Sequence, residues 1–127
     1  MPEPPPPAAP LLSAGGDAGS LRVRFAAPPC DPPATSIQVN VRKQGERTWQ
    51  AWCFNKRKLV EGKDSNAWPA STAECIIPEL DVDTTFEVGL MAKNDAGWGY
   101  MGPVAHWHLE SDDAVEFVGV RTLEERN

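Results

Sequence analysis

Hydrophobic and polar residues alternate with a period of two along several short stretches of the chain. Leucine, valine and phenylalanine alternate with two arginines in residues 21–25, and isoleucine and two valines alternate with polar residues in residues 37–42. The most regular alternation runs through residues 86–92. Because successive side chains of a β-strand point to opposite faces, each stretch is predicted to be a strand with one buried and one solvated face.

Three further stretches are predicted to be strands. They are TWQAWCF at residues 48–54, AECIIPEL at residues 73–80 and VAHWHLE at residues 104–110. In the last stretch, alternation leaves two choices for the inward face. We favour Ala105, Trp107 and Leu109, because this set is more apolar than the even-numbered residues beside it.

The polar connection at residues 55–71 has no clear period, and residues 20–110 lack the i, i+3, i+4 apolar spacing of a long helix. About six or seven short strands, with turn signals every eight to twelve residues, describe an antiparallel β-sandwich. We therefore predict an all-β domain at residues 13–110. Residues 1–12 are predicted to be a proline-rich flexible tail, and residues 111–127 an acidic tail or the start of a further element.

Residues 80–99 carry the most specific pattern in the chain. A leucine is followed six residues later by an aromatic residue that opens an alternating strand, and then by Ala-x-Asn and two closely spaced glycines. The residues are Leu80, Thr84, Phe86, Val88, Leu90, Ala92, Asn94, Gly97 and Gly99. This pattern resembles the fibronectin type III domain, and SLRVRFAAP and SIQVNVRKQG resemble that family's second and third strands. The resemblance spans roughly Pro10 to Leu109 and implies an immunoglobulin-like sandwich of about seven strands.

Two aromatic positions depart from the family's pattern. Phe86 stands where the family usually has tyrosine, so the hydroxyl that closes the tyrosine corner is missing. Phe25 stands where the family most often has tryptophan, which leaves less ring volume at the centre of the core. We expect one of the chain's other tryptophans to fill that volume.

The glycine-rich loop before the last strand holds three large side chains, Trp98, Tyr100 and Met101. In the resembled family this loop joins the last two strands and often carries the binding site. Tryptophan, tyrosine and methionine concentrate binding energy at interfaces, so the three residues are candidate contacts for a partner. The alternative is that Trp98 folds back as a lid over the end of the sandwich, onto prolines of the loop after the second strand.

Trp49 and Trp52 are a second pair of candidate contact residues. They lie three positions apart on one predicted strand, so on a regular strand they point to opposite faces. One of the two rings is therefore expected to face away from the core.

No catalytic constellation is present in the sequence. His106 and His108 share one strand face, but a third metal ligand is not evident, so we interpret them as part of a solvated face. Asp81 and Asp83 lie in a predicted turn, where aspartate bonds to the backbone. We expect no metal, no cofactor and no enzymatic activity.

The expected function is that of an interaction or spacer module within a larger protein. Its partner is expected to be another protein or a neighbouring domain of the same protein, and the module itself a monomer. The alternative is an accessory domain of an enzyme that binds a ligand such as carbohydrate through exposed aromatic rings.

The net charge of −6 comes mainly from the two ends of the chain, and residues 20–110 are nearly neutral. Without clustered positive charge, nucleic acid is not an expected ligand. Two short basic runs can form a small patch for an acidic partner or lipid headgroup, or can keep turns and sheet edges solvated, which we favour. Their residues are Arg42, Lys43, Arg47, Lys56, Arg57 and Lys58.

Cys30, Cys53 and Cys75 are widely spaced and form no CxxC pair. Three unpatterned cysteines, no membrane-length apolar run and no signal-peptide pattern favour an intracellular protein with reduced thiols. If the chain is part of an exported protein, a bridge between Cys53 and Cys75 is the alternative.

The two ends of the chain have patterns of their own. The opening PEPPPPAAP is predicted to be an extended polyproline II segment, serving as a spacer or as a docking peptide for aromatic-lined grooves. Near the other end, acids followed by VEFV are similar to a SUMO-interacting motif, and TLEE has the pattern of a capping box.

Overall fold

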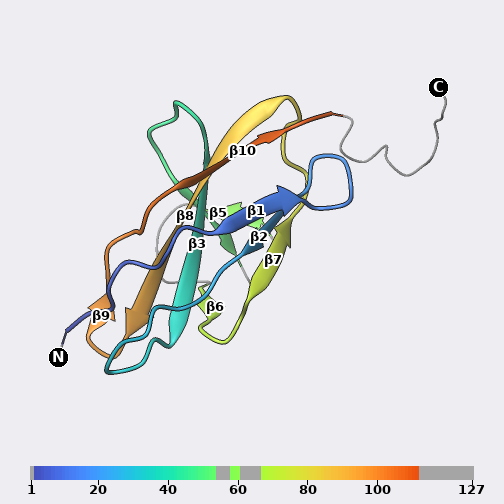
Figure 1. The fold of residues 1–127 in the computed structure, drawn as a ribbon. Helices are drawn as coiled ribbons and strands as arrows, with labels where there is room; N and C mark the ends of the chain where they lie inside the picture. The colour runs from blue at the N-terminus through green and yellow to red at the C-terminus, as the bar shows by residue number, and fades with distance from the viewer. Residues whose placement is uncertain (1, 54–57, 61–66, 112–127) are drawn as a thin grey trace.

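The computed structural model describes residues 2–53, 58–60 and 67–111 as two antiparallel β-sheets packed face to face (Figure 1). The strands are β1 (Leu11–Ala14), β2 (Leu21–Arg24), β3 (Ser36–Lys43), β4 (Gln50–Cys53), β5 (Lys58–Val60), β6 (Trp68–Pro69), β7 (Glu74–Ile77), β8 (Thr84–Asn94), β9 (Gly97–Trp98) and β10 (Ala105–Leu109). The described part of the chain contains no helix that is long and apolar enough to span a membrane.

The smaller sheet has three strands in the order β1-β2-β7. The larger sheet has the order β10-β8-β3-β4-β5, with β6 paired to β3 and β9 paired to β8. Its centre is the long β3–β8 pair, in which Val39 lies opposite Leu90 and Val41 lies opposite Val88. The predicted all-β sandwich is confirmed.

The core lies between the inward faces of the two sheets. Its fully buried members come from the alternating residues of β2, β3, β7 and β8: Leu21, Val23, Ile37, Val39, Ile77, Val88 and Leu90. On β10, Leu109 is fully buried, and Trp107 lies opposite Phe86 and packs against the core. The inward set favoured for the last strand is therefore confirmed. Trp52 and Trp68 lie in the same buried cluster as Phe25. Their rings add volume to this core, in which Phe25 is smaller than the tryptophan usual in the resembled family.

The proline-rich segment differs from the flexible tail that its composition predicts. Pro4, Pro7 and Pro10 are buried, and Pro7 is among the fully buried side chains. The segment leads into β1, which pairs with β2 along its whole length. The packed part of the molecule therefore begins before residue 13. The motifs expected in residues 112–127 lie outside the described residues.

Candidate functional site: the outer face of the large sheet and an end pocket

The outer face of the larger sheet collects most of the side chains that the sequence singles out. The alternation that turns Val39, Val41, Val88 and Leu90 inward turns the residues between them outward. The outward set is Gln38, Asn40 and Arg42 on β3, and Glu87, Gly89, Met91 and Lys93 on β8. His106 and His108 on β10 lie opposite Glu87 and Thr85 and join the same face.

Trp49 lies at one end of this face. The guanidinium carbon of Arg42 lies 4.1 Å from the centroid of the Trp49 ring, a cation–π contact. Trp52 points the other way: it is only 4% exposed, and its carbonyl accepts a hydrogen bond of 3.1 Å from the indole of Trp68. Trp49 therefore faces outward, and Trp52 belongs to the core.

Trp98 lies at the other end of the face. In the β8–β9 pair Trp98 is opposite Lys93, and directly paired residues share a face, so the ring lies on the outer surface. The ammonium of Lys93 lies 5.9 Å from the ring centroid. Trp98 is partly buried in this position. The register therefore directs Trp98 outward, where it lies against the sheet.

Met101 covers the middle of the face between the two tryptophans. A Cβ atom added to Gly89 would come 2.5 Å from the sulfur of Met101, so the thioether lies directly on this glycine. The Asn40 amide lies 3.7 Å from the same sulfur, and Gln38 donates a 2.7 Å hydrogen bond to Asn40. Both amides are buried although they point outward. Tyr100, by contrast, is 83% exposed.

A row of polar groups crosses three strands of the same face. Arg42 donates a 2.6 Å hydrogen bond to one carboxylate oxygen of Glu87, and the imidazole Nε2 of His106 lies 3.0 Å from the other oxygen. The hydrogen bond from Arg42 holds the pKa of Glu87 below its ordinary value; desolvation opposes this effect and the bond to His106 adds to it. His108 lies 2.9 Å from the hydroxyl of Thr85. Within the described residues, no group of three His, Cys, Asp or Glu is arranged to hold a metal ion.

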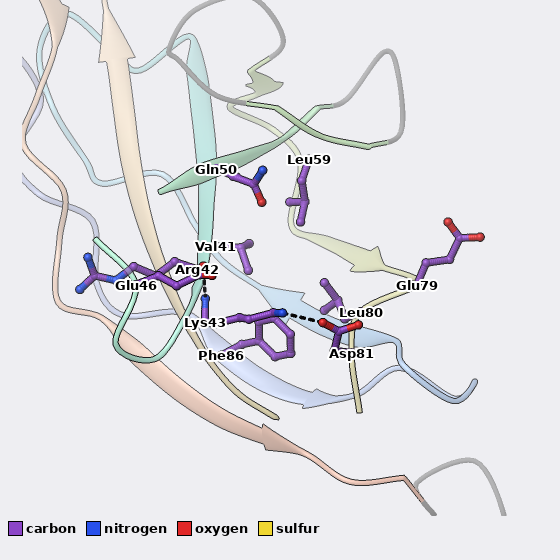
Figure 2. A pocket seen from close by; sticks show the side chains of 10 residues that line it. All are labelled: Val41, Arg42, Lys43, Glu46, Gln50, Leu59, Glu79, Leu80, Asp81 and Phe86. Carbon is purple, nitrogen blue, oxygen red and sulfur yellow. Dashed lines mark hydrogen bonds and ion pairs between the residues drawn. The ribbon is translucent and has the colours of Figure 1, made fainter. Parts of the chain in front are cut away.

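A pocket of about 260 Å³ opens at one end of the sandwich (Figure 2). Its apolar wall is formed by Val41, Leu59, Leu80 and Phe86, and its other lining residues are Arg42, Lys43, Glu46, Gln50, Glu79 and Asp81. The ammonium of Lys43 lies 2.6 Å from the carboxylate of Asp81 at the mouth. This hydrogen-bonded contact raises the pKa of Lys43. Sequence patterns did not predict this pocket. The sequence feature that relates to it is Phe86, which lines the pocket and stands where the resembled family usually has tyrosine.

Two of the described cations in the basic runs are held in ion pairs. Arg42 is paired with Glu87 and Lys43 with Asp81, which favours the interpretation that these charges solvate the sheet and its turns. Lys56 and Arg57 lie outside the described residues. Cys75 carries a free, buried thiol, and burial raises its pKa to about 12, with a smaller contribution from Glu74. Cys30 is also free and is partly exposed.

No family model and no curated protein matches the sequence. Solved structures do match the fold. A structure described as a myokine superposes with a TM-score of 0.59 at 15% identity, covering 84% of this chain and 98% of that one. The twitchin kinase region of C. elegans gives 0.65 at 16% identity, covering 97% of this chain and 19% of that one. The FN1–FN3 domains of chicken CNTN1 give 0.61 at 12% identity, covering 84% of this chain and 32% of that one. The chain therefore has a fibronectin type III-like β-sandwich fold.

Proposed function

We propose that this chain is a non-enzymatic interaction module of a larger protein, and that the outer face of its large sheet is the contact surface. The observation that supports the proposal most directly is the convergence on one face of Trp49, Trp98 and Met101, with Tyr100 exposed beside them. Several of the structures with this fold are domains of multidomain chains, such as the twitchin kinase region.

The physical character of this face suits protein recognition. Tryptophan, tyrosine, methionine and arginine are the residue types enriched in interface cores and hot spots. Arg42 and Lys93 each lie over a tryptophan ring, which limits the conformational entropy that these long side chains would lose on binding. Tyr100 supplies a large side chain that is still free to be buried. Another folded protein or a neighbouring domain is the partner that fits such a surface.

Site-specific crosslinking tests this proposal. A photo-crosslinking amino acid replaces Tyr100 in the natural full-length protein, and the matched control carries it at Ile76, an exposed residue on the smaller sheet. We expect one defined adduct from position 100 that weakens when Trp98→Ala or Trp49→Ala is added. Equal adducts from both positions, or adducts that neither tryptophan affects, would refute the outer face as contact surface.

Glycan binding is the outcome that would favour the accessory-domain alternative. A glycan-array signal that Trp98→Ala abolishes would show that the face binds sugars through its rings. The cations over Trp49 and Trp98 argue against this role, because a sugar would need to displace them to stack on those ring faces. We therefore expect no specific glycan signal.

A further inference from the structure

The proline-rich segment at the start of the chain is buried with a period of three residues. Pro4, Pro7 and Pro10 are buried, while the residues between them are exposed. Three residues per turn is the repeat of the polyproline II helix, which prolines adopt because their φ angle is fixed. Residues 2–10 therefore present one proline-lined edge of such a helix to the sandwich.

The surface that receives this edge has the same three-residue spacing. The segment lies side by side with the chain between β9 and β10 (Figure 1). A Cβ atom added to Gly99 would overlap the carbonyl of Pro4, and one added to Gly102 would overlap the carbonyl of Pro7. Glycine at both positions thus allows two backbones to meet without intervening side chains. We call the contact surface formed by Asn94, Gly99 and Gly102 the groove; its two glycines are three residues apart, as are the prolines whose carbonyls they meet.

Asn94 supplies the polar recognition at the end of the groove. Its side-chain amide donates 3.0 Å hydrogen bonds to the carbonyls of Pro2 and Pro32, and its own carbonyl accepts a 2.8 Å bond from the amide of Ala96. The residue is only 2% exposed, so its orientation is fixed by these bonds. A proline-rich segment offers carbonyl acceptors but few N–H donors, and a fixed amide donor suits that chemistry.

A hollow borders the second half of the segment. A hollow of about 280 Å³ lies under Ala8, Ala9 and Leu11, bordered by Arg24, Phe25, Ala26 and Ala73. Leu11 is 71% exposed although it opens β1. Residues 2–10 form no strand with the sandwich, so a ladder of backbone hydrogen bonds does not anchor them. The contact depends on buried prolines and on proline carbonyls that approach Gly99 and Gly102 and accept from the Asn94 amide. Another proline-rich chain can supply the same prolines and carbonyls.

We propose that the groove along Asn94, Gly99 and Gly102 is a binding site for polyproline II segments, and that residues 2–10 are its intramolecular occupant. A proline-rich segment of another protein, with proline at every third position, replaces them. The tethered segment competes at a high effective concentration, so binding in trans is weak until the segment is released. This site is separate from the outer sheet face and does not depend on the function proposed for it.

Peptide titration of the full-length chain tests the site. The probe is a fluorescein-labelled peptide with the sequence of residues 2–10, and binding is followed by fluorescence anisotropy. The variant Pro4→Gly/Pro7→Gly removes two buried rings and releases the tethered segment. We expect it to bind the peptide about tenfold or more tightly than the natural chain, because the internal competitor is weakened. The matched control, Pro5→Gly/Pro6→Gly, changes two exposed prolines and is expected to enhance binding much less.

Closing the groove provides the opposite result. Adding Gly102→Val to the released variant places a side chain where the proline carbonyl must sit, so peptide binding is expected to disappear. Gly99→Ala is the second groove variant if the valine prevents folding, which thermal unfolding will show. Unchanged affinity in the released variant, or full binding after the groove is closed, would overturn the proposal. A concentration-dependent dimer of the natural chain that Gly102→Val abolishes would instead identify a second copy as occupant and overturn the assignment to a different protein.

Discussion

At the scale of single residues, Phe86 links the core to the end pocket. It is buried on β8 and lines the pocket together with Leu80 and the Lys43–Asp81 ion pair (Figure 2). A tyrosine corner closes when the hydroxyl bonds to backbone a few residues upstream. The turn at residues 79–81 supplies such backbone here and borders the same pocket. The hydroxyl that the sequence lacks therefore has both space and polar neighbours.

Phe86→Tyr is expected to stabilise the protein. The added hydroxyl enters existing pocket space and gains a hydrogen bond, which contributes about 0.5–1.5 kcal/mol to the free energy of unfolding. Urea denaturation of the natural chain and the variant measures the difference. A lower midpoint for the variant would mean that the turn does not offer a partner to the hydroxyl and that a polar atom has been buried without one.

Residue orientations were predictable where they follow from one strand alone. Three positions separate Trp49 from Trp52, so alternation predicts that the two rings face opposite ways, and the structure places Trp52 inside and Trp49 outside. Trp98 was not predictable in this way. Its orientation depends on pairing with Lys93 of β8, across a tight turn whose register the local pattern does not specify.

At the scale of elements, a polar row joins β10, β8 and β3 across the large sheet. His106, Glu87, Arg42 and Trp49 follow one another at the distances of direct contacts. Such cross-strand contacts on one face stabilise a sheet and fix its register. The row also positions Arg42 against Trp49, so Glu87 supports the proposed contact surface without being part of its aromatic set.

Glu87→Gln is expected to reduce stability in a pH-dependent way. The pKa of Glu87 is lowered from its usual value of 4.5 in the folded protein, chiefly by the hydrogen bond from Arg42, so the charged form is the one that folding favours. Its contribution is fully present above about pH 4.5 and is lost as the pH falls through the folded-state pKa. The difference in urea midpoint between the natural chain and the variant should therefore shrink below that pH. A difference that stays constant from neutral to acid pH would contradict the role given to the charge.

Strands were predictable where the sequence pattern runs over several residues. Short strands that are defined only by their pairing in the folded chain were not predictable. The strands β2, β3, β4, β7, β8 and β10 correspond to the six stretches predicted to be strands, whereas β5 lies in the connection that shows no clear period. By contrast, β6 and β9 have two residues each, which is too short for a period to be recognised. The short β1 follows a run of prolines and acquires its strand conformation from pairing with β2. Sequence alone also gives no sign that Asn94 joins two proline-containing segments.

At the scale of the whole molecule, the sequence predicted the two-layer architecture but not how the start of the chain would pack. Composition favours an extended proline-rich segment, and an extended segment is compatible with a free tail or with a groove. The distinction depends on Gly99 and Gly102, about ninety positions away, whose lack of side chains admits the proline carbonyls. Long-range backbone contacts of this kind leave no periodic signal, since their only local mark is a pair of glycines in a loop.

The reactivity of Cys75 is expected to report on the integrity of the whole sandwich. This thiol is buried on β7 between the two sheets and its pKa is raised to about 12, so at pH 8 only about one molecule in ten thousand carries the reactive thiolate. Cys30 lies partly exposed in the β2–β3 connection. Alkylation with iodoacetamide, read for each cysteine by peptide mass spectrometry, should therefore modify Cys30 about tenfold or more faster than Cys75.

Unfolding the chain provides the control, because in concentrated guanidinium chloride both thiols should react at similar rates. The same burial predicts that the folded state loses stability at alkaline pH. Folding favours the neutral thiol, so stability is fully present below the ordinary thiol pKa of about 9 and falls as the pH rises from there toward 12. Cys75→Ala removes the titrating group, and its unfolding midpoint should fall less steeply over that range. Rapid alkylation of Cys75 at neutral pH, without loss of the folded state, would instead show that the two sheets separate locally far more often than their packed interface implies.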